Sequence, residues 1–266
     1  MLLKGLSLRK DALDELDLPI EIVGGFIGEM RLEIPWANLK NKPVIVTLDK
    51  IFALAVSVDM LDAEKILAKH LKDKLEKLAT SELLRASAAS VPLSSEKQAD
   101  SFTTSLINKI VDNLQVTVNR VHIRIEEPSR MFSLGVCINN IRGYSVDEQG
   151  VERFITEHTT EINKVAEINE LFLYMDLERK IDCKADSWLR EMDEMVDKAF
   201  HEDHNILIKP INALGTGCIQ RKLVRDKPRV VTRLQVDGLS VESDEKQLHE
   251  LLLVAQRFIL LSRRRY

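Results

Sequence analysis

Apolar and polar residues alternate with a period of two over many short segments of the chain. This period places successive side chains on opposite faces of a β-strand. Between 114–118 and 121–125, Asn119 and Arg120 shift the phase of the alternation, which predicts a bulge or a bend within one long strand. Glycines on both sides of Phe26 predict a tight turn or a bulge between two strands. The predicted strands are residues 30–34, 44–48, 114–118, 121–125, 132–138, 171–175, 206–208 and 230–236.

A second period, of three to four residues, predicts amphipathic helices between these strands. The helix predicted over 62–86 has an apolar face with leucines such as Leu67 and Leu71, and its opposite face is rich in lysine. We interpret that basic face as a solvated surface, with contact to an anionic membrane as the alternative. Residues 87–96 have the composition of a linker. The predicted helices are residues 9–18, 62–86, 100–113, 185–201 and 243–263.

Together these elements predict an α+β fold with a long, mostly antiparallel sheet. The segments around 114–124 and 234–241 share one pattern: an alternating strand, a short shift in the phase of the alternation, and a second alternating strand. This weak similarity suggests a sheet that is extended by repeating one strand type. The alternation gives the sheet an apolar face much wider than the few predicted helices can cover. The uncovered face is the main functional clue in the sequence.

Composition narrows the possible functions. The chain has 266 residues and a net charge of −4, so it lacks the basic surplus of a nucleic-acid-binding surface. Its 10 glycines and 7 prolines are few for a loop-rich enzyme. The three cysteines are widely spaced, which predicts buried or indifferent thiols in a reducing compartment. Apolar runs are too short to span a bilayer, and charges within the first ten residues argue against a signal peptide.

Candidate chemistry is sparse. The glycines of segment 24–28 resemble half of a dinucleotide-binding motif but have no helix after them. His201 and His204, with two carboxylates between them, could hold zinc, although we interpret them as exposed residues near a helix end. His122 is interpreted as a solvent-facing strand residue and Trp36 as a corner-packing residue. We therefore predict neither catalytic nor metal-binding residues.

A resemblance to a known family runs through nearly the whole chain. Its motifs include Gly-Phe-Ile-Gly at 25–28, Ile-Pro-Trp at 34–36 and Val-His-Ile-Arg-Ile-Glu at 121–126. Further motifs lie at 6–19, 110–116, 132–136, 169–174 and 208–211. As an ordered series, these segments resemble the chorein-type N-terminal region of the vacuolar-protein-sorting-thirteen proteins. The family's first apolar helix has no counterpart before Met1. We therefore expect residues 1–266 to form a single domain that is an N-terminal fragment of a longer protein.

The resemblance implies a bridge-like lipid transfer protein whose long, strongly curved sheet forms an open hydrophobic groove, with helices packed on or across it. Such a protein carries glycerophospholipids as cargo, has no cofactor and is not an enzyme. Its implied partners are phospholipids, organelle membranes contacted peripherally, and adaptor proteins bound through regions outside this chain; nucleic acid is not among them. The implied location is cytoplasmic, at membrane contact sites, with this region at the endoplasmic-reticulum end.

Strand alternation indicates which side chains would line the groove. If one apolar face curls into a trough, acyl chains complete the core that the helices leave unfinished. Two alternatives remain: a non-catalytic structural or protein-interaction module with an ordinary buried sheet, and a hydrolase whose site is scattered along the chain. The predicted lipid-binding residues are Leu32, Ile34, Val116, Val118, Val121, Ile123, Leu134, Val136, Ile138, Leu173, Met175, Leu234 and Val236.

Overall fold

The chain forms two compact units, one of residues 1–57 with 108–266 and one of residues 58–107. A computed structural model describes residues 1–9, 20–39, 41–57, 75, 78–79, 82, 107–127, 132–155, 161–177, 188–201, 204–221 and 228–263. The predicted helices over 9–18 and 62–86 and the linker over 87–96 lie wholly or almost wholly outside these residues. Within the predicted helix over 100–113, residues 107–112 are helical. The arrangement below is that of the first unit, and a single domain over 1–266 stays a prediction.

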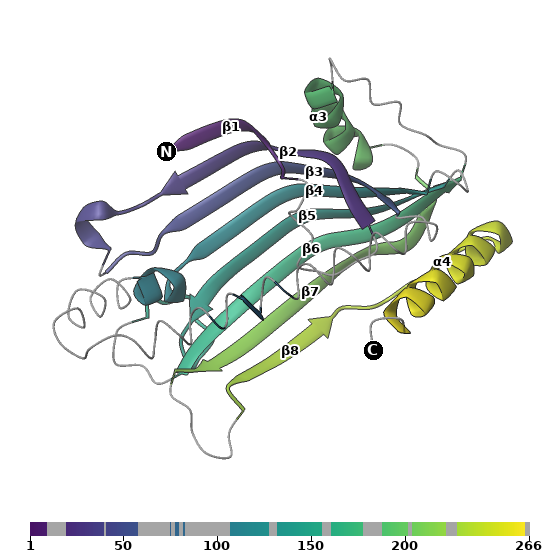
Figure 1. The fold of residues 1–266 in the computed structure, drawn as a ribbon. Helices are drawn as coiled ribbons and strands as arrows, with labels where there is room; N and C mark the ends of the chain where they lie inside the picture. The colour runs from purple at the N-terminus through teal and green to yellow at the C-terminus, as the bar shows by residue number, and fades with distance from the viewer. Residues whose placement is uncertain are drawn as a thin grey trace. The chain divides into compact units, whose positions relative to one another are not determined.

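The first unit is built on one sheet whose eight described strands lie side by side in sequence order (Figure 1). Neighbouring strands are antiparallel, except that β3 and β4 are parallel. The predicted α+β fold with a mostly antiparallel sheet is therefore confirmed. The strands are β1 (Leu2–Ser7), β2 (Ile20–Glu33), β3 (Ile45–Ser57), β4 (Gln115–Glu127), β5 (Phe132–Val146), β6 (Glu161–Leu177), β7 (Ile206–Gln220) and β8 (Val230–Val236).

The connections explain this topology. Antiparallel neighbours can be joined by a short link, as the 3-10 helix η2 (Trp36–Asn38) does between β2 and β3, but the connection from β6 to β7 is longer and contains helix α3 (Trp188–Ala199). The parallel pair needs a long crossover, and residues 58–114 supply it. The glycine-rich segment 24–28 lies inside β2, where a register shift falls between Ile22 and Gly24. A bulge therefore occurs here, but the predicted break between two strands is wrong.

A line of irregular residues crosses the middle of the sheet. Lys50, Arg120 and Glu170 have positive φ angles of 57°, 51° and 52°, a conformation that is uncommon for residues other than glycine. The register places Lys50 beside Arg120, and it places Glu170 across β5 from Arg120. We call this row the fold line. It confirms the phase shift predicted at Asn119 and Arg120 and extends it to β3 and β6.

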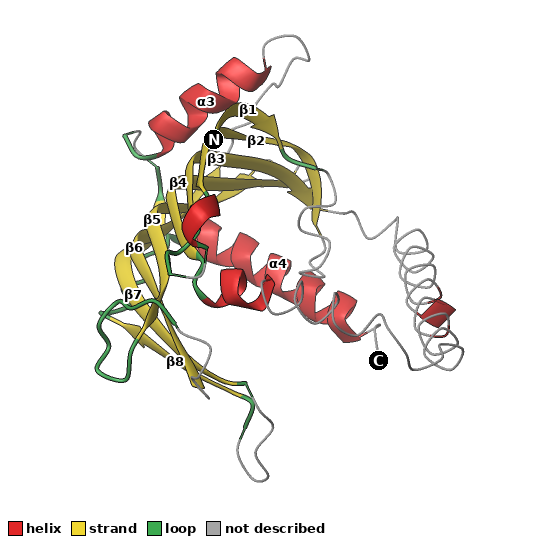
Figure 2. Cartoon of the chain, turned by 90° about the vertical axis from the view of Figure 1, so that its left-hand side faces the viewer, coloured by secondary structure: helices red, strands yellow, loops and turns green. Residues whose placement is uncertain are grey.

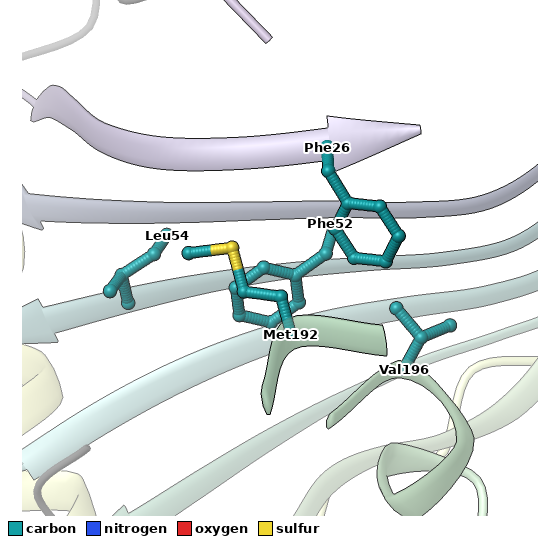
Figure 3. Close-up of a cluster of buried hydrophobic side chains, with 5 residues drawn as sticks. All are labelled: Phe26, Phe52, Leu54, Met192 and Val196. Carbon is teal, nitrogen blue, oxygen red and sulfur yellow. The ribbon is translucent and has the colours of Figure 1, made fainter. Parts of the chain in front are cut away.

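Two described helices lie on opposite faces of the sheet (Figure 2). Helix α3 (Trp188–Ala199) packs Met192 and Val196 against Phe26, Phe52 and Leu54 (Figure 3). Helix α4 (Glu245–Arg263) packs on the other face and matches the helix predicted over 243–263.

The start of α4 is fixed by a capping box. The backbone N of Gln247 donates to Asp244 Oδ1 (2.7 Å), and the backbone N of Asp244 donates to Gln247 Oε1 (2.9 Å). Gln247 Nε2 also donates to the carbonyl oxygen of Met175 (3.0 Å). The cap therefore attaches the beginning of α4 to β6.

Candidate functional site

Apolar residues form continuous rows across the strands. Residues that are directly paired in a sheet point to the same face, so the register identifies which side chains lie together. The fold line divides the sheet into two halves. In the half that contains the C-terminal part of β3, the first row comprises Leu6, Ile27, Ile51, Val121, Ile138, Leu171 and Ile211. The first row on the other side comprises Leu3, Met30, Leu48, Val118, Ile141, Ile168, Ala213 and Val236.

The fold line keeps these two rows on one face. Asp49 and Lys50 are consecutive, yet both point toward α3: Lys50 Nζ donates to Asp197 Oδ2 (2.8 Å), and Asp49 accepts from Arg120, which also contacts Asp197. Leu48 and Ile51 on either side of this pair therefore both point away from α3. Without the extra residue, the alternation would turn the apolar side chains of each half toward opposite faces.

Three further rows extend the same face in steps of two residues. On the side of the fold line that contains Ile51, the next row comprises Ala53, Ile123, Val136, Leu173 and Ile208. Beyond it lie Ala55, Ile125, Leu134 and Met175. The outermost row on the other side comprises Leu32, Val46, Val116, Gly143, Ala166, Gly215 and Leu234. These five rows contain no charged side chain, and we call them together the apolar face.

Almost all predicted lipid-binding residues lie on the apolar face. Every one of them belongs to one of the five rows except Ile34, which follows the end of β2. Their exposure varies: Leu234 is 68% exposed, whereas Met175 is fully buried. Lipid contact by these residues stays a prediction. The predicted set left out row residues of two kinds: some, such as Ile168, lie outside the predicted strands, whereas others, such as Leu48 and Leu171, lie within them.

Helix α4 covers one end of the apolar face. Its residues Leu251 and Val254 pack against a cluster of Phe132, Met175 and Leu207. This contact explains why Met175 is buried although it shares a face with half-buried neighbours. Met175, one of the predicted groove residues, therefore lies beneath α4.

The face that α3 covers carries a second core and a buried polar network. A ladder across five strands, from Phe26 through Phe52, His122 and Cys137 to Phe172, is buried there. The interpretation of His122 as solvent-facing is wrong, because the side chain is only 3% exposed. The apolar neighbours of His122 in sequence point to the apolar face, so His122 points into this second core.

Tyr174 is the centre of the polar network. Its hydroxyl lies 2.8 Å from His122 Nε2 and accepts from Arg124 Nη1 (3.3 Å). Its ring stacks on His204, with 3.9 Å between ring centroids. A Cβ on Gly135 would lie 1.9 Å from the Tyr174 ring, so glycine leaves the space that the ring fills. Burial, followed by the charge of Arg124, lowers the pKa of His122 to about 3, and burial raises the pKa of Tyr174.

His204 also differs from its interpretation as an exposed residue. Its Nδ1 lies 2.7 Å from Asp176 Oδ2, and the two side chains are 5% and 4% exposed. An imidazole oriented by a carboxylate is one half of many hydrolase sites. Here both groups are too deeply buried for a substrate to reach them. His201 is exposed, and no group of three possible metal ligands gathers among the residues that the structure describes.

Three smaller predictions have clear outcomes. Cys137 is buried, and burial raises the pKa of its thiol to about 12, which fits the expected inert cysteine. Trp36 does not pack into a corner as predicted, because 76% of its surface is exposed. Among the described helices, none combines the length and the apolar composition needed to cross a bilayer.

Comparison with known proteins identifies the family. The VPS13-like family N-terminal region matches residues 1–264. The chain belongs to this family. It is 28% identical over 278 residues to the intermembrane lipid transfer protein VPS13 of Chaetomium thermophilum, covering 96% of this chain and 9% of that protein. Its identity to vps13A of Dictyostelium discoideum is 32%, over 95% of this chain and 8% of that protein.

The human intermembrane lipid transfer protein VPS13D is a further relative, with 26% identity over 94% of this chain and 6% of its own length. The chain therefore spans less than a tenth of these VPS13 relatives. The resemblance read from the sequence motifs is confirmed for nearly the whole chain.

Proposed function

We propose that this chain holds glycerophospholipids by their acyl chains on the apolar face and passes them between organelle membranes at contact sites. The observation that carries the proposal is the continuity of the five uncharged rows across the sheet, much of which is only half-buried. The names of its VPS13 relatives, intermembrane lipid transfer proteins, support the same function.

The physical basis is burial of apolar surface. Each methylene of an acyl chain gains about 0.8 kcal/mol when it leaves water, so two chains offset the cost of ordering a lipid. Because the rows lack charge, lipid slides along them without being held at one position. The protein carries its cargo chemically unchanged, with no cofactor, and contacts membranes peripherally from the cytoplasm. We place this region at the endoplasmic-reticulum end of a longer carrier that recruits adaptors through other regions.

One experiment tests the apolar face directly. Val116→Asp with Ile123→Asp puts two charges into rows that acyl chains would occupy, so we expect lipid binding to be lost while the fold survives. The control is Thr117→Asp with Thr216→Asp, on the opposite face of the same sheet. Phospholipid co-purifying with each variant is quantified by mass spectrometry, transfer is followed with labelled lipid between vesicles, and folding is checked by circular dichroism. Normal lipid binding by the first variant would show that this face is not the binding site.

An interaction module is the second candidate, and strand β8 favours it. All seven residues of β8 are exposed, and they include Val230, Val231 and Leu234. Such a strand at the edge of a sheet can pair with a strand of another protein. Absence of any phospholipid in the purified wild-type protein, together with absence of transfer, would favour this candidate over lipid carriage.

A further inference from the structure

A cavity lies where β2 ends and the chain turns into β3. Its volume is about 560 Å³, and its lining includes Leu32, Glu33, Ile34, Trp36 and Lys42. Leu32 also belongs to the outermost row of the apolar face, beside Val46. The cavity therefore adjoins one end of that face, and its size falls within the range of small-molecule sites.

The lining of this cavity differs in charge from the apolar face. It combines the Lys42 ammonium, the Glu33 carboxylate and the Trp36 ring, and all three residues are exposed. A lysine ammonium pairs with a phosphate oxygen. A carboxylate and the face of an indole ring both attract a substituted ammonium. One group that carries a phosphate and an ammonium a few atoms apart matches this combination.

We propose that the cavity holds the zwitterionic headgroup of a phospholipid whose acyl chains begin on the apolar face at Leu32. Lys42 contacts the phosphodiester, while Glu33 and Trp36 contact the choline or ethanolamine ammonium. The inference rests on the proposed lipid carriage and adds to it a place where headgroups are distinguished. Elsewhere the apolar face holds lipid without distinguishing headgroups, because its rows are uncharged.

Competition between lipids that differ only in their headgroup tests the proposal. The full chain, stripped of lipid, is incubated with vesicles that contain equal amounts of phosphatidylcholine and diacylglycerol with the same acyl chains. Exposed ionic and cation–π contacts of this kind predict about a fivefold preference for phosphatidylcholine by mass spectrometry. Lys42→Glu should bring the ratio close to one without changing the total lipid bound. Lys246→Glu, at an exposed lysine on α4, is the matched control and should keep the preference.

Phosphatidic acid separates the two halves of the site, because it carries the phosphate without the ammonium. Glu33→Gln with Trp36→Leu should lower phosphatidylcholine binding about threefold relative to phosphatidic acid, whereas Lys42→Glu should lower the binding of both phospholipids relative to diacylglycerol.

Fluorescence locates the headgroup. The chain has two tryptophans, so Trp188→Phe leaves Trp36 as the only reporter. Phosphatidylcholine with a nitroxide on its choline should quench Trp36 more strongly than the same lipid with the nitroxide at the end of an acyl chain.

The outcomes distinguish the two proposals. A wild-type protein that binds both lipids without preference, or a preference that survives Lys42→Glu, overturns the headgroup site and leaves lipid carriage intact. Equal quenching of Trp36 by the two nitroxide lipids also overturns the headgroup site. A wild-type protein that takes up no lipid of any class overturns lipid carriage, and the headgroup site with it.

Discussion

Burying a polar side chain away from water costs free energy unless the side chain finds a hydrogen-bond partner. On the face that α3 covers, specific contacts between side chains offset this cost. His122 stays neutral there because burial and the nearby Arg124 disfavour its charged form, while Tyr174 supplies a hydrogen-bond partner for the ring. The same Tyr174 contacts Arg124 and His204. A single tyrosine on β6 thus connects β4 with the segment that leads from α3 into β7.

The lowered pKa of His122 predicts a pH-dependent stability. The unfolded chain protonates this imidazole near its ordinary pKa of 6.5, but the folded chain does so only near 3. The contribution of His122 to the free energy of unfolding is therefore at its maximum above pH 6.5. As pH falls from 6.5 toward 3, the free energy of unfolding decreases by about 1.4 kcal/mol per pH unit, because the unfolded chain takes up a proton that the folded chain does not. We expect His122→Gln to flatten this decrease in urea unfolding measured at pH 7, 6, 5 and 4. Parallel curves for the two proteins would contradict the assignment to His122.

The interpretations of single residues show what a sequence reveals at this scale. Alternation assigned Val121 and Ile123 to one face, and they lie on it. It also implied that His122 faces away from them, which is correct. The further inference that His122 is exposed to solvent was wrong, because no local pattern shows that α3, more than sixty residues later, covers the opposite face. Trp36 was misread for a similar reason, since a loop position does not reveal whether any element packs on it.

At the scale of elements, the fold line and α3 form one unit. Lys50 contacts Asp193 (3.0 Å) and Asp197 (2.8 Å) of α3, and Arg120 contacts Asp197 (3.1 Å). Burial alone would lower the pKa of Lys50, but its bonds to the two aspartates outweigh this and raise it. The bond from Lys50 lowers the pKa of Asp197. Two residues in an unfavourable backbone conformation are thereby held by the helix that covers them.

We expect packing to hold α3 in place more strongly than these ion pairs. Asp197→Asn should cost about 0.5–1 kcal/mol of unfolding free energy, because the pairs are partly exposed. Val196→Ala, in the fully buried core beside it, should cost roughly 1–3 kcal/mol. Because the folded pKa of Asp197 is lowered, the difference between wild type and Asp197→Asn exists above the ordinary value of 3.8 and disappears as pH falls through the folded pKa. Urea unfolding at pH 7 and at pH 3 measures both effects.

The lengths of the elements were harder to predict than their existence. Strands β6 and β7 extend well beyond the predicted 171–175 and 206–208. Residues 161–170 and 209–220 alternate weakly, because polar residues and glycine occupy positions on both faces. Pro210 interrupts β7 where the register to β6 is irregular, a place that tolerates a missing amide. Strand pairing with neighbours extends these segments, and such pairing is not visible in the local sequence.

At the scale of the whole unit, the two helices have different relations to the apolar face. Helix α3 lies on the opposite side and shapes the sheet without occupying the space where lipid would bind. Helix α4 occupies one end of the apolar face itself, through Leu251 and Val254. In the proposed function, a lipid on the apolar face would therefore compete with α4 for this end of the face. The sequence predicted both helices but could not say which face each of them covers, because either side of the sheet offers apolar residues.

This competition gives a prediction for the amount of lipid carried. Leu251→Ala with Val254→Ala weakens the contact of α4 with Phe132, Met175 and Leu207, so more of the apolar face becomes available and the phospholipid bound per chain should rise. Leu252→Ala, at an exposed leucine of the same helix, should leave it unchanged. Lipid extracted from equal amounts of each folded protein is counted by phosphorus assay. A fall in the first variant would mean that α4 holds lipid against the sheet instead of displacing it, which would reverse the role assigned to this helix.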